Sequence, residues 1–191
     1  MKAVLESRTL NPTLWRTCRM LAGATRVKLL RQLHEQPGRN LSELAKAVQI
    51  GISAASQELR RIQSRGLLKV ERRRSFAFYR FGADPQVPTA EPLLKALQSA
   101  LRNYPEERDQ EIIQIAKGFS HPRRIAILKE LGKAPKRRLV LRGIANLPQS
   151  SASRHVGVLV QSALVSCENG WLVLKRSRHP LACALLHLTV D

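Results

Sequence analysis

Residues 21–33 read LAGATRVKLLRQL and residues 119–131 read FSHPRRIAILKEL, so the two segments align without a gap at an offset of 98. A second pair follows in the same order: ASQELRRIQSRGLL at residues 55–68 aligns with ASRHVGVLVQSALV at residues 152–165, at an offset of 97. An internal repeat of this length indicates one small domain present twice, not a solenoid of short units. The chain therefore carries a first repeat and a second repeat of similar fold.

The expected boundary between the repeats is Asn103-Tyr104-Pro105, which gives two domains, residues 1–103 and residues 104–191. This boundary is short, so the two domains should pack together. Within each repeat, apolar residues recur first at helical spacing and then in alternation. The expected fold class is therefore mainly α with small β-hairpin wings, as two tandem winged helix-turn-helix domains.

Helix signals place the expected elements. In the first repeat we expect a helix of about ten residues after Asn11-Pro12 and helices over residues 25–36, 41–48, 53–64 and 92–103, with Ser53 as the N-cap of the fourth. In the second repeat we expect helices over residues 106–118, 122–132, 140–146, 149–162 and 180–188, with a basic loop at residues 133–138. Hairpins are expected from strands 67–73 and 76–81, and around Asn169-Gly170.

The composition indicates a folded protein that meets a polyanion. Apolar residues make up 43% of the chain, which is enough for a packed core. Lys and Arg number 33 against 14 Asp and Glu, which gives a net charge of +19 and a pI of about 11.3. The excess is present in both repeats, and a folded chain this basic is expected to meet a polyanion.

Several classes of protein are disfavoured. There is no apolar run of the roughly 20 residues that cross a bilayer, and the N-terminal segment lacks a signal-peptide core, so we expect a cytoplasmic protein without membrane contact. There is no Gly-rich phosphate loop, nucleophile elbow or inward-facing carboxylate pair, so we expect no enzyme. Cys18, Cys167 and Cys183 have no metal-knuckle spacing and are expected to be buried small hydrophobes.

One further pattern lies on the last expected helix, where His179, Cys183 and His187 recur at four-residue intervals. This spacing places them on one face, where a metal or redox site is conceivable. Leucines crowd the same helix, so a core role is favoured over a ligand role. We expect no metal and no cofactor.

Three signatures in this order resemble the ArsR-type winged helix-turn-helix of prokaryotic repressors, present twice. The first is SHPRRIAILKEL (120–131) with its partner ATRVKLLRQL (24–33). The second is LSELAKAV (41–48), similar to the family's "ELA" helix. The third is QSSASRHVGVLVQSALV (149–165), similar to the recognition helix and its exit, with GISAASQELRRIQSRGLL (51–68) as counterpart. The resemblance implies a transcription regulator, often a homodimer joined through its first and last helices.

The sequence departs from the metal-sensing members of that family. Those members carry paired cysteines on the helix before the recognition helix, but here that helix reads SELAKAV in the first repeat and VLRGIAN in the second. Neither segment contains Cys or His, so the family's metal site is absent from the sequence.

A helix that reads DNA needs an exposed face of hydrogen-bond donors for base edges and phosphates. In the first repeat the expected DNA-binding residues are Ser53, Ser56, Gln57, Arg60 and Arg61 on the helix and Arg72, Arg73 and Arg74 at the hairpin tip. In the second repeat they are Ser150, Ser151, Ser153, Arg154 and His155. The second hairpin tip, Glu168-Asn169-Gly170, is slightly acidic, and its helix is more apolar, so this repeat is expected to read DNA more weakly or to contact another protein.

The favoured function is transcription regulation by a nucleoid-associated protein that binds double-stranded DNA. The helices at residues 92–103 and 106–118 both carry apolar stripes, so one chain can supply all four helices of a dimer-like bundle and form an intramolecular pseudo-dimer. A homo-oligomer through the terminal helices is also possible. Two alternatives stay open: a tandem winged-helix scaffold of the kind that partners kleisins in chromosome condensation, and a plasmid-type replication initiator.

Overall fold

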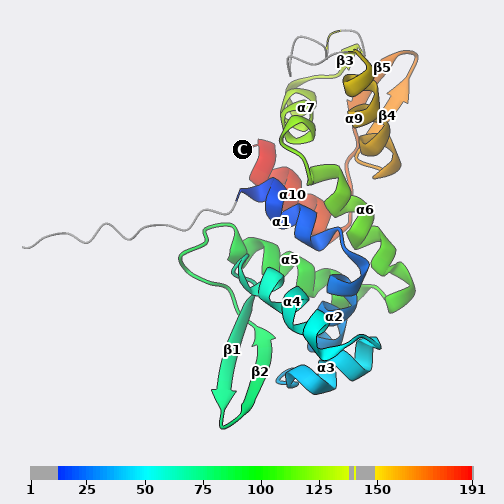
Figure 1. The fold of residues 1–191 in the computed structure, drawn as a ribbon. Coiled ribbons are helices and arrows are strands. Elements are labelled where there is room, and N and C mark those ends of the chain that lie inside the picture. The colour runs from blue at the N-terminus through cyan, green and yellow to red at the C-terminus, as the bar shows by residue number, and fades with distance from the viewer. Residues whose placement is uncertain (1–12, 138–139, 141–148, 191) are drawn as a thin grey trace, which may run out of the picture.

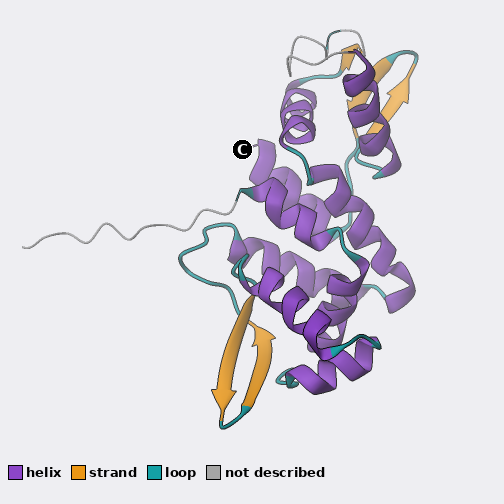
Figure 2. Ribbon diagram, in the orientation of Figure 1, coloured by secondary structure: helices purple, strands orange, loops and turns teal. Residues whose placement is uncertain are grey.

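The computed structural model describes residues 13–137, 140 and 149–190. In this part of the chain the fold is mainly helical, with small antiparallel sheets (Figure 2). The expected helix near residues 140–146 lies outside the described residues. Within them, no helix is both long enough and apolar enough to span a membrane.

The first repeat folds close to the expected boundaries. Its elements are α1 (Leu14–Leu21), α2 (Ala24–Glu35), α3 (Leu41–Val48), α4 (Ile52–Gln63), β1 (Leu68–Arg73), β2 (Phe76–Phe81) and α5 (Ala90–Asn103). One detail is wrong: Ser53 is not the N-cap of α4, because Gly51 takes that position in extended backbone and Ser53 falls in the first turn.

The described elements of the second repeat follow the order of the first, with η1 and β3 added and the counterpart of α3 outside the described residues. They are η1 (Glu106–Arg108), α6 (Asp109–Phe119), α7 (Pro122–Lys133), β3 (Lys136–Arg137), α9 (Gln149–Gln161), β4 (Val165–Glu168), β5 (Trp171–Leu174) and α10 (Pro180–Val190). The expected basic loop is wrong in part, because Lys136 and Arg137 pair with Leu172 and Trp171 of β5 as a short third strand. The sheet order is β3-β5-β4.

A shared contact shows that the two repeats fold alike at their first turn. The guanidinium of Arg26 donates to the carbonyl oxygen of Met20, six residues earlier. Arg124, its counterpart in the sequence repeat, donates through Nε to the carbonyl oxygen of Gly118, again six residues earlier, at 3.1 Å. The arginine at this repeat position therefore ties the start of one helix to the end of the helix before it.

Equivalent helices of the two repeats pack against each other in the middle of the molecule. α1 lies against α6, and α5 lies against α10, so first helix meets first helix and last meets last (Figure 1). The β1–β2 hairpin projects at one end of the molecule, and the β3–β5–β4 sheet lies at the other. The buried apolar side chains, including Leu97, Phe119 and Leu185, form one continuous core across both repeats.

A buried ion pair joins the repeats where the chain passes from one to the other. Arg31 of α2 is 4% exposed, and its guanidinium pairs with the carboxylate of Asp109 at the start of α6. The same guanidinium donates to the carbonyl oxygens of Leu101 at 2.6 Å and Tyr104 at 3.0 Å. A buried charge is tolerated when its donors are satisfied. One side chain therefore fixes α2, the end of α5 and the start of α6 together.

Removing one partner of this pair should destabilise the whole protein. Asp109→Leu leaves the buried Arg31 cation uncompensated, and Arg31→Met leaves the Asp109 carboxylate uncompensated, so we expect each single change to lower the free energy of unfolding by about 3–5 kcal/mol. The double variant Arg31→Met/Asp109→Leu removes both charges and should recover most of that loss. Urea denaturation of the four proteins of this cycle measures the coupling. Strictly additive effects of the two single changes would contradict the assigned role.

Candidate nucleic-acid interface

The recognition helix predicted in the first repeat is α4, which turns one face to the core and the other to solvent. Ala55, Leu59 and Ile62 are fully buried on the inner face. The opposite face carries the side chains predicted from the sequence. Ser53, Gln57, Arg60 and Arg61 are exposed, and Ser56 is half-buried.

Strand alternation divides the three arginines of the hairpin tip between two faces. Arg72 and Arg74 lie on the face toward α4. Arg73 lies on the opposite face, where Glu71 accepts from its Nε at 2.8 Å and its guanidinium lies 5.6 Å from the ring of Phe78. The sequence predicted a single basic tip, but the structure directs only part of it toward the helix.

Backbone contacts hold this hairpin beside the α2–α3 turn. The amide of Tyr79 donates to the carbonyl oxygen of Arg39 at 3.0 Å, and the amide of Gly38 donates to the carbonyl oxygen of Tyr79 at 3.2 Å. Asn40, next in the chain, caps α3 through a reciprocal pair of bonds with Glu43. The hairpin and the start of α3 are therefore held next to each other by hydrogen bonds at residues 38–40.

Between α4 and the hairpin lies a groove of about 630 Å³, named here the α4–wing groove. It is lined by Leu41, Ser56, Arg60, Gln63, Val70, Arg72, Arg74, Ser75, Phe76, Ala77 and Tyr79. Three of these side chains are arginines and none is a carboxylate. The groove therefore presents positive charge and hydrogen-bond donors without an internal anion to neutralise them.

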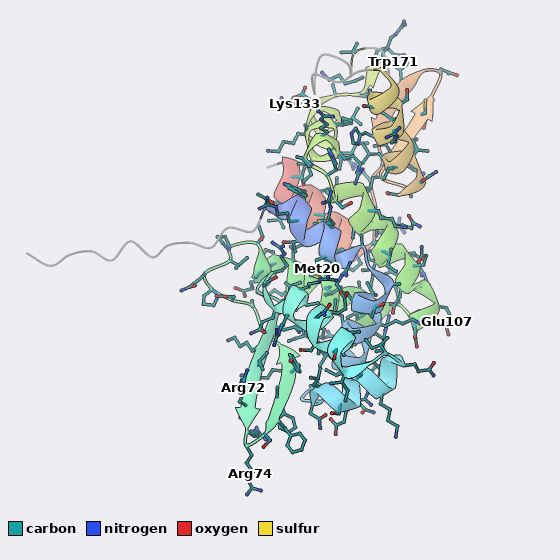
Figure 3. The ribbon with its side chains drawn as sticks, in the orientation of Figure 1. Met20, Arg72, Arg74, Glu107, Lys133 and Trp171 are labelled. Carbon is teal, nitrogen blue, oxygen red and sulfur yellow. The ribbon has the colours of Figure 1, made fainter. Side chains whose placement is uncertain are left out.

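Ion pairs separate the cations of this surface into two groups. Arg61 pairs with Glu58 at 2.6 Å and Arg73 with Glu71 at 2.8 Å, and the hydrogen bond from Arg73 lowers the pKa of Glu71. Within the described part of the chain, Arg60, Arg72 and Arg74 have no ion-pair partner. These three guanidinium groups line the α4–wing groove and are available to an external anion. Figure 3 shows Arg72 along the hairpin and Arg74 extending beyond its end.

Two apolar side chains of this surface were missed by sequence reasoning. Phe76 at the start of β2 lines the α4–wing groove, and Ile52 begins α4; each is 55% exposed. The signal for Phe76 was the segment FAFYRF, which is more aromatic than a strand with one buried face requires. Such side chains can contact the methyl group of thymine or wedge against a base step.

The second repeat offers a smaller polar surface on α9. Arg154 is exposed and Ser151 and Ser153 are half-buried, whereas Ser150 lies in the first turn of the helix, where the structure does not describe its side chain. The prediction that His155 faces solvent is wrong, because this side chain is only 9% exposed. His155 lies three residues after Ala152 and four before Leu159, which places it in the helix's buried stripe.

His155 lies among cationic side chains, whereas the equivalent residue of the first repeat forms ion pairs. Its counterpart is Glu58, which forms ion pairs with Arg26 and Arg61 at 2.6 Å each. His155 instead packs on the ring of His121 at 4.5 Å, and its Nδ1 is buried without a hydrogen-bond partner. Burial lowers the pKa of His155 to about 4, with further contributions from His121 and nearby arginines. The ring is therefore neutral near pH 7.

The second hairpin has a tight turn and an exposed aromatic ring. Its turn has Asn169 at φ 50° and Gly170 at φ 78°, the left-handed pair that a tight type I′ hairpin requires, which confirms the expected turn. The guanidinium of Arg137 lies 5.3 Å from the exposed ring of Trp171. Figure 3 shows Trp171 at the end of the molecule opposite Arg74.

The cysteine prediction is only partly right. Cys18 is fully buried, and burial raises the pKa of its thiol, but Cys167 and Cys183 are exposed. The core role expected for the last-helix pattern holds for His179, which is 7% exposed, and is wrong for His187 and Cys183. In the ranges that the structure describes, no three His, Cys, Asp or Glu side chains gather closely enough to hold a metal ion.

Comparison with protein-family models, curated proteins and solved structures finds no match to this chain. The functional argument therefore depends on the geometry described above.

The environment of His155 predicts a loss of stability in mild acid. Its folded pKa lies below the ordinary value of 6.5, so the unfolded chain takes up a proton first and the free energy of unfolding falls as the pH drops from 6.5 toward 4. His34, His121 and His179 also have lowered pKa values and act in the same direction. His155→Phe keeps a ring against His121 and should flatten the pH dependence of urea denaturation over this window.

The free energy of unfolding of His155→Phe is subtracted from that of the wild type at each pH. Carboxylates that titrate near pH 4 contribute equally to both proteins and cancel in this difference. Identical pH profiles for the wild type and His155→Phe would contradict the assigned environment.

Proposed function

We propose that this chain is a DNA-binding transcription regulator that reads duplex DNA through two winged helix-turn-helix units. The observation that carries the proposal is the α4–wing groove, which gathers Arg60, Arg72 and Arg74 without a carboxylate. A helix with a neighbouring hairpin is the arrangement in which a recognition helix enters the major groove and a wing contacts the flanking backbone. The net charge of +19 adds general attraction to the phosphates.

The exposed side chains of α4 and of the hairpin match the chemistry of the major and minor grooves of DNA. Gln57 and Arg60 on the exposed face of α4 suit adenine and guanine edges, since Gln and Arg form paired hydrogen bonds to those bases. Arg72 and Arg74 on the hairpin suit phosphates or a narrow minor groove. Ser53 and Ser56, near the start of the helix, are placed for phosphate contacts.

The paired packing of α1 with α6 and of α5 with α10 supports an intramolecular pseudo-dimer. In single-domain regulators of this type, the first and last helices join two chains, and here the same helices join two repeats of one chain. The two recognition helices of such an arrangement would lie roughly 34 Å apart, one turn of DNA.

The two units are expected to read different half-sites. α4 presents Gln57, Arg60 and Arg61, whereas α9 presents Arg154 with half-buried serines. The second hairpin tip carries Glu168 in place of the arginines of the first. We therefore infer that the first repeat contributes most of the affinity.

A prediction about DNA binding concerns salt and the two faces of the hairpin. If about six phosphates are neutralised, the logarithm of the binding constant should fall with the logarithm of the salt concentration at a slope of roughly −5. Arg72→Ala should flatten this slope by about one unit, because an arginine on the groove face is lost. Fluorescence anisotropy on a random duplex across salt concentrations measures both.

Arg73→Ala is the matched control, since it removes the same charge one residue away on the opposite face, where Glu71 already pairs with it. Arg74→Gly is a second variant, because Arg74 has φ 52° and glycine adopts this backbone without strain. This variant should weaken DNA binding while leaving the fold as stable as the wild type, or up to about 1 kcal/mol more stable. A slope near zero for the wild type, or no binding at low salt, would remove DNA from the proposal and favour a protein-interaction scaffold.

A further prediction concerns stoichiometry and asymmetry. One 21.5 kDa chain should protect two unequal half-sites on an operator selected from random sequence. Arg60→Ala should relax base preference in one half-site by about 1–3 kcal/mol, and Arg154→Ala should act only on the other. Light scattering of the complex and selection with each variant test these outcomes. Two chains on one two-half-site operator would show that each chain reads a single half-site.

A further inference from the structure

A pocket of about 310 Å³ lies in the second repeat, away from the α4–wing groove. It is formed by α6, the turn that follows α9 and the segment that leads into α10. Its lining residues are Gln110, Glu111, Gln114, Ile115, Gln161, Ser162, Ala163, Leu164, Ser177 and His179. The volume falls at the lower end of the roughly 300–1,000 Å³ typical of small-molecule sites.

The two repeats differ in sequence at the position of this pocket. In the repeat register, Ser162 takes the position of Arg65, so a small side chain replaces a long one. Close packing next to the pocket keeps its shape, because a Cβ on Gly118 of α6 would meet Cδ1 of Leu164 at 2.3 Å. The pocket is therefore bordered by a closely packed contact between α6 and the turn that follows α9.

The pocket combines apolar walls with a fixed hydrogen-bond donor. Ile115 and Leu164 are buried apolar side chains, and His179 is 7% exposed. The His179 ring stacks on Tyr104 with centroids 5.0 Å apart, and its Nδ1 accepts from the amide of Leu181 at 3.2 Å. Since burial lowers the pKa of His179, the ring is neutral near pH 7 and carries its proton on Nε2.

The charges of the lining select against ionic ligands. No Lys or Arg lines this pocket, although the chain has a net charge of +19. The one carboxylate, Glu111, is paired with Arg108 through two hydrogen bonds of 2.6 and 2.9 Å. A carboxylate or phosphate ligand would find no cation in the lining, and a cationic ligand would compete with Arg108 for Glu111.

We propose that this pocket binds a small uncharged molecule with an apolar body and a carbonyl group, whose oxygen accepts the Nε2–H of His179. Gln114, Gln161 and Ser177 supply further polar contacts at the rim. The pocket includes the turn directly after α9, so an occupant contacts the end of the second repeat's recognition helix. On the basis of the proposed function, occupancy changes DNA affinity, and DNA changes ligand affinity by the same factor.

Three probes of one shape test the ligand class: naphthamide, which is neutral, naphthoate, which is anionic, and naphthylmethylammonium, which is cationic. Titration calorimetry of the full-length protein without DNA should give saturable binding of naphthamide, with the two ions weaker by at least about tenfold. Ser162→Arg restores the side chain of the first repeat and should weaken naphthamide binding by about tenfold or more. Ala134→Arg adds the same charge at an exposed position outside the pocket and should leave naphthamide binding unchanged.

Gln114→Phe fills the pocket without a new charge and should weaken naphthamide binding as Ser162→Arg does. Two different filling variants are used so that a folding defect in one of them does not decide the result. The site is overturned if none of the probes binds, if naphthoate binds as well as naphthamide, or if binding survives both filling variants. The second arm repeats the DNA titration with naphthamide present. Unchanged DNA affinity at saturating naphthamide overturns the coupling to α9, and the DNA titration without ligand reports separately on the proposed function.

Discussion

The arrangement of the molecule depends on the guanidinium of Arg31, which is buried at the crossing between the two repeats. A buried cation must be fully paired, so Asp109 and the carbonyl oxygens of Leu101 and Tyr104 are constrained to lie around it. These partners span the end of α5, the connection and the start of α6. The register of the sequence repeat places Lys129, which is exposed, at the corresponding position of the second repeat. Arg31 therefore belongs to the junction and not to the repeated unit.

Away from that junction, the two repeats share a contact at their first helix turn but differ in the charge of the residue beside it. The arginine that ties the first turn together is present twice, as Arg26 and Arg124. Its neighbour is Glu58 in one repeat and His155 in the other, so a neutralised site becomes a cluster of cations with a neutral, buried histidine. The contact at the first helix turn is therefore common to both repeats, while the residue beside it differs in charge.

Much of the fold could be predicted because its signals are local. Helical spacing and turn residues placed most helices and strands of the described chain within a few residues, including α3 and the hairpin at Asn169-Gly170. The errors depend on three-dimensional neighbours. The N-cap of α4 is Gly51 and not Ser53, and Cys167 and Cys183 are exposed. The short strand β3 forms only because β5 lies beside it.

The candidate site was predictable as a set of residues but not as a geometry. Local sequence indicated the basic face of α4 and the arginines of the hairpin, yet the assignment of Arg72 and Arg74 to one face and Arg73 to the other follows from strand register. The ion pairs of Arg61 and Arg73 likewise depend on side-chain placement. His155 was the avoidable error, because its spacing from Ala152 and Leu159 already placed it in the buried stripe.

The packing of α1 on α6 and of α5 on α10 within a single chain has a consequence for how the protein responds to its own concentration. Two separate subunits must find each other, so their assembly is second order in protein and is lost on dilution. Here the linker keeps the matching helices at a high effective concentration, and their contact forms at any dilution. The contact between these helices is therefore independent of protein concentration, unlike the same contact between two separate subunits.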